Sequence, residues 1–141
     1  MNIVSIDDIS DGRLAPYLNL RNRNPTSLSG HFIVESKLFV QRLVDSAYEI
    51  ESIVVDDPDM VESDWALRCQ QIYHVPNVSQ LIGFHFHRGA LACGIRQAVR
   101  DASELSGTAV LSKDHAKSFR SVYLHAVQDP ENMGSIFRSC A

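Results

Sequence analysis

The chain has 141 residues, of which 45% are hydrophobic, and its formal net charge is −4 at pH 7. This length allows one full domain plus part of another, and the apolar content can supply a hydrophobic core. The acidic balance argues against a wholly basic nucleic-acid-binding protein, so an RNA site would have to be a local basic patch.

The cysteines and the N-terminus bear on the cellular compartment. Cys69, Cys93 and Cys140 are widely spaced and form no CxxC pair, so reduced thiols are the simplest interpretation. The N-terminus is polar, which argues against a signal peptide, and no apolar run is long enough to span a membrane. We therefore expect a cytoplasmic protein without membrane contact.

Strand-like and helix-like patterns alternate along most of the chain. After a polar lead, residues 1–30, the predicted elements in chain order are strand 31–35, helix 38–48, strand 50–55, a helix over about 60–69, strand 72–75, a short helix over 77–82, and strand 90–95. The last of these strands consists of small residues and is expected to be buried on both faces. Strands that alternate with helices in this way indicate an α/β sandwich.

The C-terminal part begins with a strand predicted at 122–127. Pro130 lacks an amide hydrogen and must lie beyond the end of that strand. Asn132 is a favourable N-cap for the helix that follows, and Gly134 leaves room for a close approach by backbone or ligand. In one continuous helix, Asn132 and Arg138 would lie roughly 240° apart. We therefore expect Asn132 in the loop or at the cap, with Arg138 reaching back from the helix.

The order of strand, Asp129-Pro130, Asn132, Gly134 and Arg138 resembles the first signature of the SpoU/TrmH family of RNA ribose methyltransferases. The phrases Phe32-Ile33-Val34-Glu35 and His87-Arg88-Gly89-Ala90-Leu91-Ala92 are similar to the substrate-binding domain that precedes the catalytic domain in many of these enzymes. Ser36 departs from the pattern, because the family often has glycine directly after the glutamate.

The resemblance implies a domain organisation. Residues 1–105 would be an RNA substrate-binding domain with an L7Ae/L30e-like α/β sandwich, and residues 106–120 a linker. Residues 121–141 would hold the first strand and the helix start of a SPOUT (trefoil-knot) catalytic domain. The chain would then be a fragment, because the S-adenosylmethionine pocket of such enzymes lies further downstream.

The implied reaction is S-adenosylmethionine-dependent methylation of a ribose 2′-hydroxyl in rRNA or tRNA, by a homodimer formed through the SPOUT domain. The fragment alone would be inactive. Asn132 and Arg138 match the family's catalytic residues. A guanidinium with a pKa above ~12 is a poor proton acceptor, so Arg138 is expected to orient the hydroxyl and stabilise the developing alkoxide. Asn132 would position Arg138 or the ribose. Otherwise Asn132 is a plain helix cap and Arg138 a surface residue.

The candidate RNA patch comprises Arg21, Arg23 and Arg88, together with Glu35. Arginines in loops can fork onto phosphates, and Glu35 could orient one of them. The alternative is that Arg21 and Arg23 are solvated charges and that Glu35 forms a structural salt bridge or cap.

Two neighbouring features have competing interpretations. Phe84 or Phe86 could stack an unpaired base, but both could instead belong to the core. His85 and His87 would share one face of a strand, yet no third ligand with zinc-like spacing follows, so no metal is expected.

A second hypothesis is a free-standing, non-catalytic RNA-binding module of L7Ae type. The sequence beyond residue 141 would discriminate the two, because further strands with Gly- and Pro-containing loops are expected only of the methyltransferase.

Overall fold

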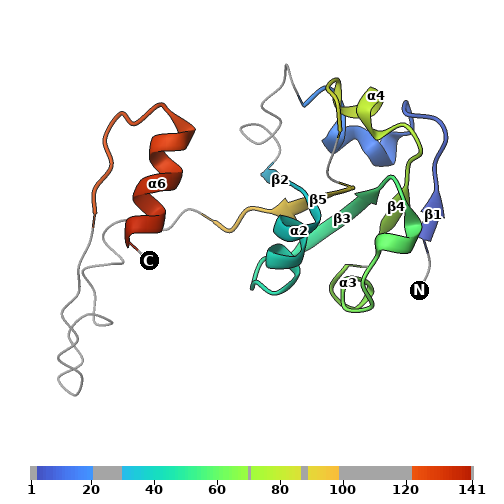
Figure 1. Ribbon diagram of the computed structural model, residues 1–141, viewed down its shortest axis with the longest axis horizontal. Helices are drawn as coiled ribbons and strands as arrows, with labels where there is room; N and C mark the ends of the chain where they lie inside the picture. The colour runs from blue at the N-terminus through green and yellow to red at the C-terminus, as the bar shows by residue number, and fades with distance from the viewer. Residues whose placement is uncertain (1–2, 21–29, 70, 87–88, 99–121, 141) are drawn as a thin grey trace. The chain divides into compact units, whose positions relative to one another are not determined.

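The computed structural model describes residues 3–20, 30–69, 71–86, 89–98 and 122–140 (Figure 1). The chain divides into two compact units, residues 1–98 and 99–141. The predicted linker, residues 106–120, lies outside the described residues. Among the helices described, none is long and apolar enough to cross a membrane.

The first unit is built on a five-stranded mixed sheet with strand order β1-β4-β3-β5-β2. Strands β1, β4 and β3 run parallel, whereas β5 is antiparallel to both β3 and β2. Their bounds are β1 Ile3–Ser5, β2 His31–Glu35, β3 Ile50–Val55, β4 Ile72–His74 and β5 Ala90–Ile95. The four strands predicted for this part of the chain, 31–35, 50–55, 72–75 and 90–95, are therefore confirmed, and so is the α/β class.

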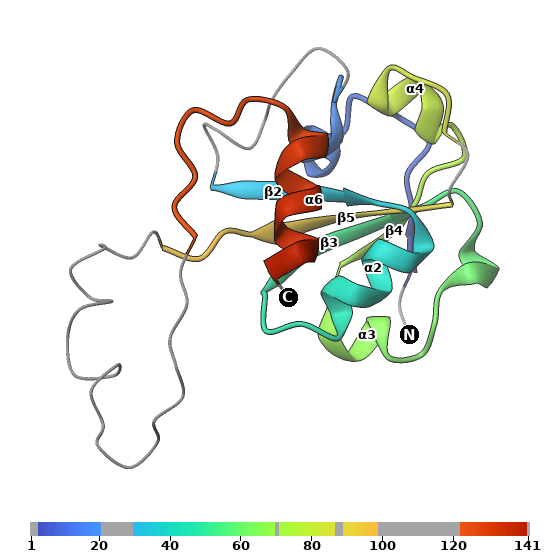
Figure 2. The same ribbon diagram turned by 60° about the vertical axis from the view of Figure 1, so that its left-hand side comes forward.

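Helices cover both faces of this sheet (Figure 2). Their bounds are η1 Gly12–Tyr17, α2 Lys37–Val44, η2 Pro58–Met60, α3 Trp65–Arg68 and α4 Val78–Ile82. The 3-10 helix η1 and α4 pack on one face, and α2 and α3 on the other. In β3, Val54 contributes to the first core while Ile53 and Val55 contribute to the second. Because both faces are covered, residues 53–55 of β3 are all apolar, as are the side chains of β5.

The lead contains two elements that the sequence did not predict. Strand β1 pairs with β4, which lies about seventy positions away along the chain, through Ile3↔Ile72 and its neighbours. Helix η1 is anchored by Leu14 and Tyr17, both fully buried. The Tyr17 hydroxyl donates to the Ser52 carbonyl oxygen at 2.9 Å, and burial raises the pKa of Tyr17 well above its ordinary value. These long-range contacts stabilise a segment whose local sequence is mostly polar.

Two predicted helices are shorter than expected. Helix α2 ends at Val44, because the Ser46 hydroxyl donates to the Leu43 carbonyl at 2.7 Å and Arg68 Nε donates to the Val44 carbonyl at 3.0 Å. The helix predicted over 60–69 is replaced by η2 and α3. Gln41 then joins α2 to α3, since it accepts from Trp65 Nε1 at 2.6 Å.

The second unit contains α6, Pro130–Cys140. The strand predicted at 122–127 is wrong, because these residues have no regular strand structure and Ala126 has a positive φ of 55°. A strand needs a neighbour that accepts and donates its backbone hydrogen bonds. The described residues of this unit, 122–140, include no second strand that could do so.

Candidate functional site

One edge of the sheet gathers the ends of several strands. β2 ends and β5 begins there, as the pairs Val55↔Ala90 and Glu35↔Leu91 show, and β3 and β4 end at the same edge. Ligands of open α/β sheets commonly bind outside the carboxyl ends of the parallel strands. We call this position the loop edge. It comprises the polar residues Glu35, Ser36, Asp56, Asn77 and Ser79, together with Gly89.

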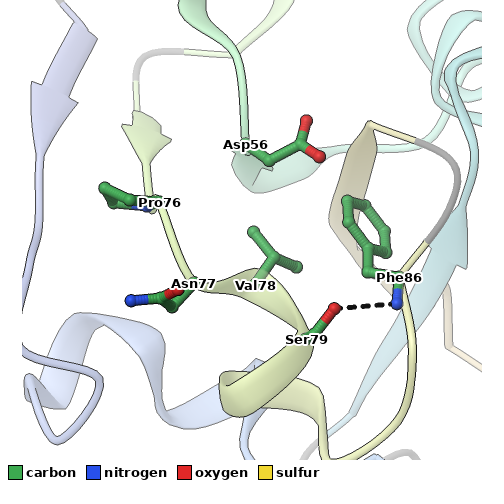
Figure 3. Close-up of a pocket in the computed structure, with 6 residues that line it drawn as sticks. All are labelled: Asp56, Pro76, Asn77, Val78, Ser79 and Phe86. Atoms are coloured by element: carbon green, nitrogen blue, oxygen red, sulfur yellow. Dashed lines mark hydrogen bonds between the residues drawn. The ribbon is translucent and has the colours of Figure 1, made fainter.

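A hollow of about 100 Å³ opens at the loop edge (Figure 3). It is lined by Asp56, Pro76, Asn77, Val78, Ser79 and Phe86. The Ser79 hydroxyl accepts a hydrogen bond from the Phe86 amide at 2.9 Å. A carboxylate, an amide and a hydroxyl therefore border an apolar floor. Such groups suit a flat ligand with hydrogen-bonding edges, whereas the Asp56 carboxylate would repel a phosphate.

Two tight backbone positions shape the loop edge. Ser36 has φ 95°, its amide donates to the Ala90 carbonyl at 2.9 Å, and its hydroxyl caps α2 by accepting from the Phe39 amide at 3.4 Å. The turn is therefore made although a serine stands where glycine is common. Gly89 has φ 70°, and a Cβ there would overlap the Met60 methyl group.

The N-cap of α6 differs from the prediction. Asp129 is the cap, because its Oδ1 accepts from the Glu131 amide at 2.8 Å and lies 3.5 Å from the Asn132 amide. The prediction of Asn132 as the cap, or in the loop, is wrong, since Asn132 lies in the first helical turn. An aspartate followed by Pro130 at the first helical position satisfies cap and N1 preferences together.

Arg138 lies in the last turn of α6 and is exposed. Its guanidinium lies along the helix toward Gly134, where a Cβ would be 3.6 Å from Arg138 Nη1. Asn132 is also exposed, but six residues of α-helix separate the two by roughly 240° around the axis. The helix alone therefore does not bring Asn132 and Arg138 together.

Known proteins share this fold and sequence to different degrees. No family model matches the chain. An AdoMet-bound rRNA methyltransferase from Sinorhizobium meliloti superposes with a TM-score of 0.54 at 11% identity, over 69% of this chain and 38% of that one. An RNA 2′-O ribose methyltransferase superposes with a TM-score of 0.56 at 15% identity, over 99% of this chain and 51% of that one. Likeness at these identities shows a shared fold.

Other known proteins are more similar to this chain in amino-acid sequence. Proteins named as uncharacterized tRNA/rRNA methyltransferases from Mycobacterium bovis and Mycobacterium tuberculosis are each 31% identical to this chain. The alignment has 149 positions and covers 100% of this chain. The chain is therefore similar along its whole length to proteins named as RNA methyltransferases, in agreement with the SpoU/TrmH resemblance described from its sequence. It spans about half the length, 49%, of these curated relatives.

The RNA-contact residues predicted from the sequence are only partly located. Glu35 is half-buried at the loop edge, at the end of β2. Arg21, Arg23 and Arg88 lie outside the described residues. Asp56, Asn77 and Ser79 join Glu35 at that edge and were missed, because their common location depends on strand order. The only sequence signal for them was that they follow the ends of β3 and β4.

The aromatic residues of the loop 83–86 pack against the hydrophobic core. Phe86 is only 8% exposed and belongs to the core under η1 and α4, and Phe84 packs partly buried against the same core. Of the two interpretations given for Phe86, the core position is therefore confirmed. His87, the partner considered for His85 in a metal site, lies outside the described residues.

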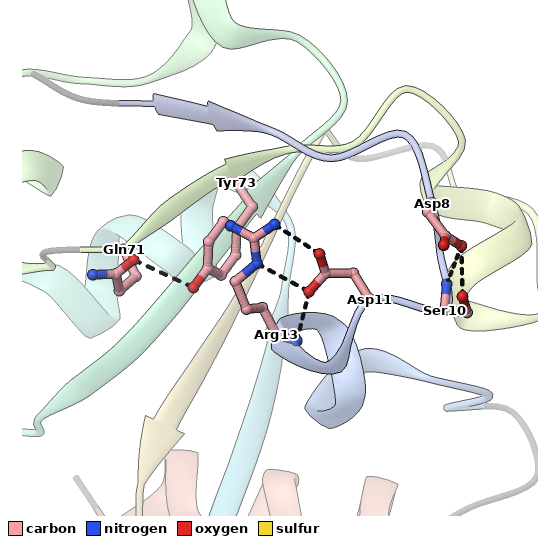
Figure 4. Close-up of polar contacts among 6 residues, drawn as sticks. All are labelled: Asp8, Ser10, Asp11, Arg13, Gln71 and Tyr73. Carbon is pink, nitrogen blue, oxygen red and sulfur yellow. Dashed lines mark hydrogen bonds and ion pairs between the residues drawn. The ribbon is translucent and has the colours of Figure 1, made fainter.

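Several described cations are already engaged within the protein. Arg13 forms an ion pair with Asp11 at 2.7 Å and lies 5.8 Å from the centre of the Tyr73 ring (Figure 4). The hydrogen bond from the Arg13 side chain lowers the pKa of Asp11 to about 2. Arg68 donates to backbone carbonyls, and Lys37 pairs with Glu62 at 2.5 Å. These side chains are less available to phosphates than a free arginine would be.

Proposed function

We propose that the protein carrying this sequence methylates a ribose 2′-hydroxyl of rRNA or tRNA with S-adenosylmethionine. The main support for this proposal is the similarity, over the whole of this chain, to proteins named tRNA/rRNA methyltransferases. The similarity includes the segment with Asn132 and Arg138. The names of the fold neighbours support the cofactor and the reaction, since one is AdoMet-bound and another is an RNA 2′-O ribose methyltransferase. This chain would supply RNA recognition and the first catalytic motif.

Residues 1–105, which include the first unit, would form the L7Ae/L30e-like domain that binds the RNA substrate. The loop edge offers carboxylate, amide and hydroxyl groups from Asp56, Asn77 and Ser79, which can hydrogen-bond to base edges. Its negative charge makes it a poor phosphate site. Phosphate contacts would therefore come from Arg21, Arg23 and Arg88, with Glu35 orienting one of these arginines.

Residues 121–141 would begin the SPOUT catalytic domain. When bound, S-adenosylmethionine supplies an electrophilic methyl group, and no described residue of this chain is assigned to hold it. Arg138 would orient the 2′-hydroxyl in line with the methyl carbon and stabilise the oxygen as it gains negative charge. A base role does not suit a guanidinium. Asn132 would contact the ribose or hold Arg138, with the rest of the domain bringing the two groups together.

Assembly of the whole enzyme would also involve the second unit. Val122, Tyr123 and Phe137 are 61%, 86% and 62% exposed. Exposed apolar groups of this kind are typical of surfaces that another part of a protein covers. The proposal assigns them to the remainder of the SPOUT domain and its homodimer, in the cytoplasm.

A methylation assay on the full protein tests the proposal. RNA from cells that lack the gene is incubated with the protein and S-adenosylmethionine labelled in its methyl group, and the labelled RNA is then hydrolysed in alkali. A 2′-O-methyl group blocks cleavage of the adjacent phosphodiester, so one band should be missing from the ladder at the labelled nucleotide. Label without a missing band would indicate base methylation, and absence of label would overturn the proposed activity.

A non-catalytic RNA-binding module is the second candidate. It is favoured by the first unit, whose sheet carries a buried core on each face and so has what an independently folding domain needs. In that case the full protein would bind structured RNA in an anisotropy titration, and no RNA would gain label in the methylation assay.

A further inference from the structure

Three side chains of metal-ligating type meet on one face of the sheet in the first unit. They are His31 of β2, Glu51 of β3 and Cys93 of β5. Glu51 Oε2 lies 3.1 Å from His31 Nε2 and 3.2 Å from Cys93 Sγ. All three ligand atoms lie within 4.8 Å of one another, and no other such group occurs in the part of the chain that the structure describes.

Strand pairing explains why His31 and Cys93 share a face. Cys93 lies opposite Ile33 in the antiparallel pair of β2 and β5. His31 is two residues from Ile33 along β2, so both side chains project to the same side of the sheet. That side carries the core under η1 and α4, to which Ile33 and Cys93 both contribute.

A β-bulge brings Glu51 to the same side. The register between β3 and β5 shifts between Ile50, opposite Gly94, and Ser52, opposite Cys93. Ile50 is buried in the core under α2 and α3. In a regular strand Glu51 and Ser52 would face opposite sides, yet Ser52 contacts Tyr17 and Glu51 accepts from Cys93. Bulges commonly re-aim a side chain next to a functional site.

The donor set is one sulfur, one imidazole nitrogen and one carboxylate oxygen. Zn²⁺ accepts all three kinds of ligand, at about 2.3 Å from sulfur and about 2.0–2.2 Å from nitrogen and oxygen. Tetrahedral coordination at these lengths separates the ligand atoms by roughly 3.3–3.6 Å, slightly more than the 3.1 Å and 3.2 Å from Glu51 Oε2 to the other two ligand atoms. The His31 and Glu51 side chains are 27% and 43% exposed, so they have room for this small adjustment.

We propose that His31, Glu51 and Cys93 bind one Zn²⁺ ion, with the fourth coordination position open to water. The ion replaces the proton that the Cys93 thiol now donates to Glu51, and that proton passes to solvent. Three neighbouring strands, β2, β3 and β5, are thereby cross-linked at the end opposite the loop edge. Zinc should therefore stabilise the first unit, independently of the methyltransferase activity.

The test uses the full 141-residue chain with Cys140→Ser, which removes the exposed thiol of the second unit. Calorimetric titration with Zn²⁺ in two buffers of different ionisation enthalpy should give one ion per chain and release of protons. Co²⁺ in place of Zn²⁺ should produce a thiolate-to-metal charge-transfer band. Zinc should also raise the melting temperature.

Ligand variants decide the assignment. His31→Gln and Glu51→Gln alter partly exposed side chains, and each should weaken Zn²⁺ binding at least ~100-fold, because even second-shell changes cost 10–100-fold. Cys93→Ser should also abolish the cobalt band. Cys69→Ser is the matched control, since Cys69 is a buried thiol in the opposite core, and it should bind zinc normally. Absence of stoichiometric binding by the parent chain, or unchanged affinity in both glutamine variants, would overturn the site and leave a structural hydrogen-bonded cluster.

Discussion

Arg138 is placed where a long side chain can act on a ligand beyond its own helix. It occupies the last turn of α6, is exposed, and extends toward Gly134, which carries no side chain in its way. A planar guanidinium can hold a hydroxyl and a phosphate at once, which an ammonium cannot do with the same geometry. The proposed role therefore depends on shape as well as on charge.

Arg138→Lys in the full protein should slow methyl transfer while leaving RNA and cofactor binding nearly normal. Losing one preorganised donor to a developing oxyanion typically costs on the order of 10²–10³ in rate. Single-turnover methylation at saturating substrates measures this step. Arg42→Lys changes another exposed helical arginine, on α2, and should retain the parent rate. A lysine variant at position 138 with full turnover would make Arg138 a surface residue.

Asp11 links the stability of the first unit to pH. Its pKa falls to about 2 because the Arg13 side chain and amide donate to it. The unfolded chain, with a carboxyl pKa near 3.9, then binds more protons than the folded one between about pH 4 and pH 2. The contribution of Asp11 is thus complete above about pH 4 and is lost as the pH falls toward 2.

Asp11→Asn should therefore lower the urea midpoint at about pH 5, and the difference from the parent chain should shrink as the pH falls to about 2.5. Asp7→Asn, at an exposed carboxylate nearby, serves as the control. A difference between Asp11→Asn and the parent that is constant across this range would contradict the linkage.

At the scale of elements, short helices and turns at the strand ends create the loop edge. Gly89 illustrates how closely they fit, because it has a φ of 70° and the Met60 side chain leaves no room for a Cβ at this position. Asp129 plays the corresponding part in the second unit, where it begins α6 by capping two amides. Gly89 thereby sets the direction in which β5 begins, and Asp129 sets the direction in which α6 begins.

Gly89→Ala should destabilise the first unit by about 1–3 kcal/mol, since alanine is strained at this φ and its Cβ meets Met60. Urea unfolding measures the loss. Gly12→Ala is the matched control, because its φ is not in the left-handed region and a Cβ there meets nothing within 4 Å. Adding Met60→Ala should recover only the steric part. Equal midpoints for Gly89→Ala and Gly12→Ala would exclude this account.

For the whole molecule, charge is distributed unfavourably for a general RNA binder. The net charge is −4, and Arg13, Arg68 and Lys37 are engaged within the protein. The proposed RNA binding would then depend on a few arginines in a local patch. This is a property of the whole charge distribution rather than of any one element.

The double variant Arg21→Ala, Arg23→Ala should weaken RNA binding and reduce its salt dependence. Each lost phosphate contact should lower the slope of log K against log salt by about 0.7–0.9. Fluorescence anisotropy at several salt concentrations measures the slope, and methylation at saturating RNA should stay near the parent rate. Arg42→Ala, which removes one exposed positive charge on α2, provides the control. An unchanged slope in the double variant would remove Arg21 and Arg23 from the RNA site.

Local patterns were sufficient for the inner part of the fold. Strands such as Ile50–Val55 and Ala90–Ile95 are apolar on both faces, and that property is written in consecutive residues. The signature at Asp129 to Arg138 is likewise local, and its resemblance to that of the SpoU/TrmH family depends on consecutive residues alone. The cap of α6 was local as well, because Asp129 is followed by Pro130 at the first helical position, a signal that the prediction of Asn132 overlooked.

Long-range contacts decided the remainder. Strand β1 forms because Ile3 pairs with Ile72. Tyr17 is buried because it packs on one face of the sheet, where its hydroxyl donates to the Ser52 carbonyl. The gathering of Asp56, Asn77 and Ser79 depends on strand order, and the meeting of His31 with Glu51 depends on a bulge. The sequence by itself determined which segments are apolar and which helix starts are favourable, since these are properties of neighbours along the chain. Which distant polar groups share a face was decided only when the strands paired, because pairing and register are set by the whole sheet.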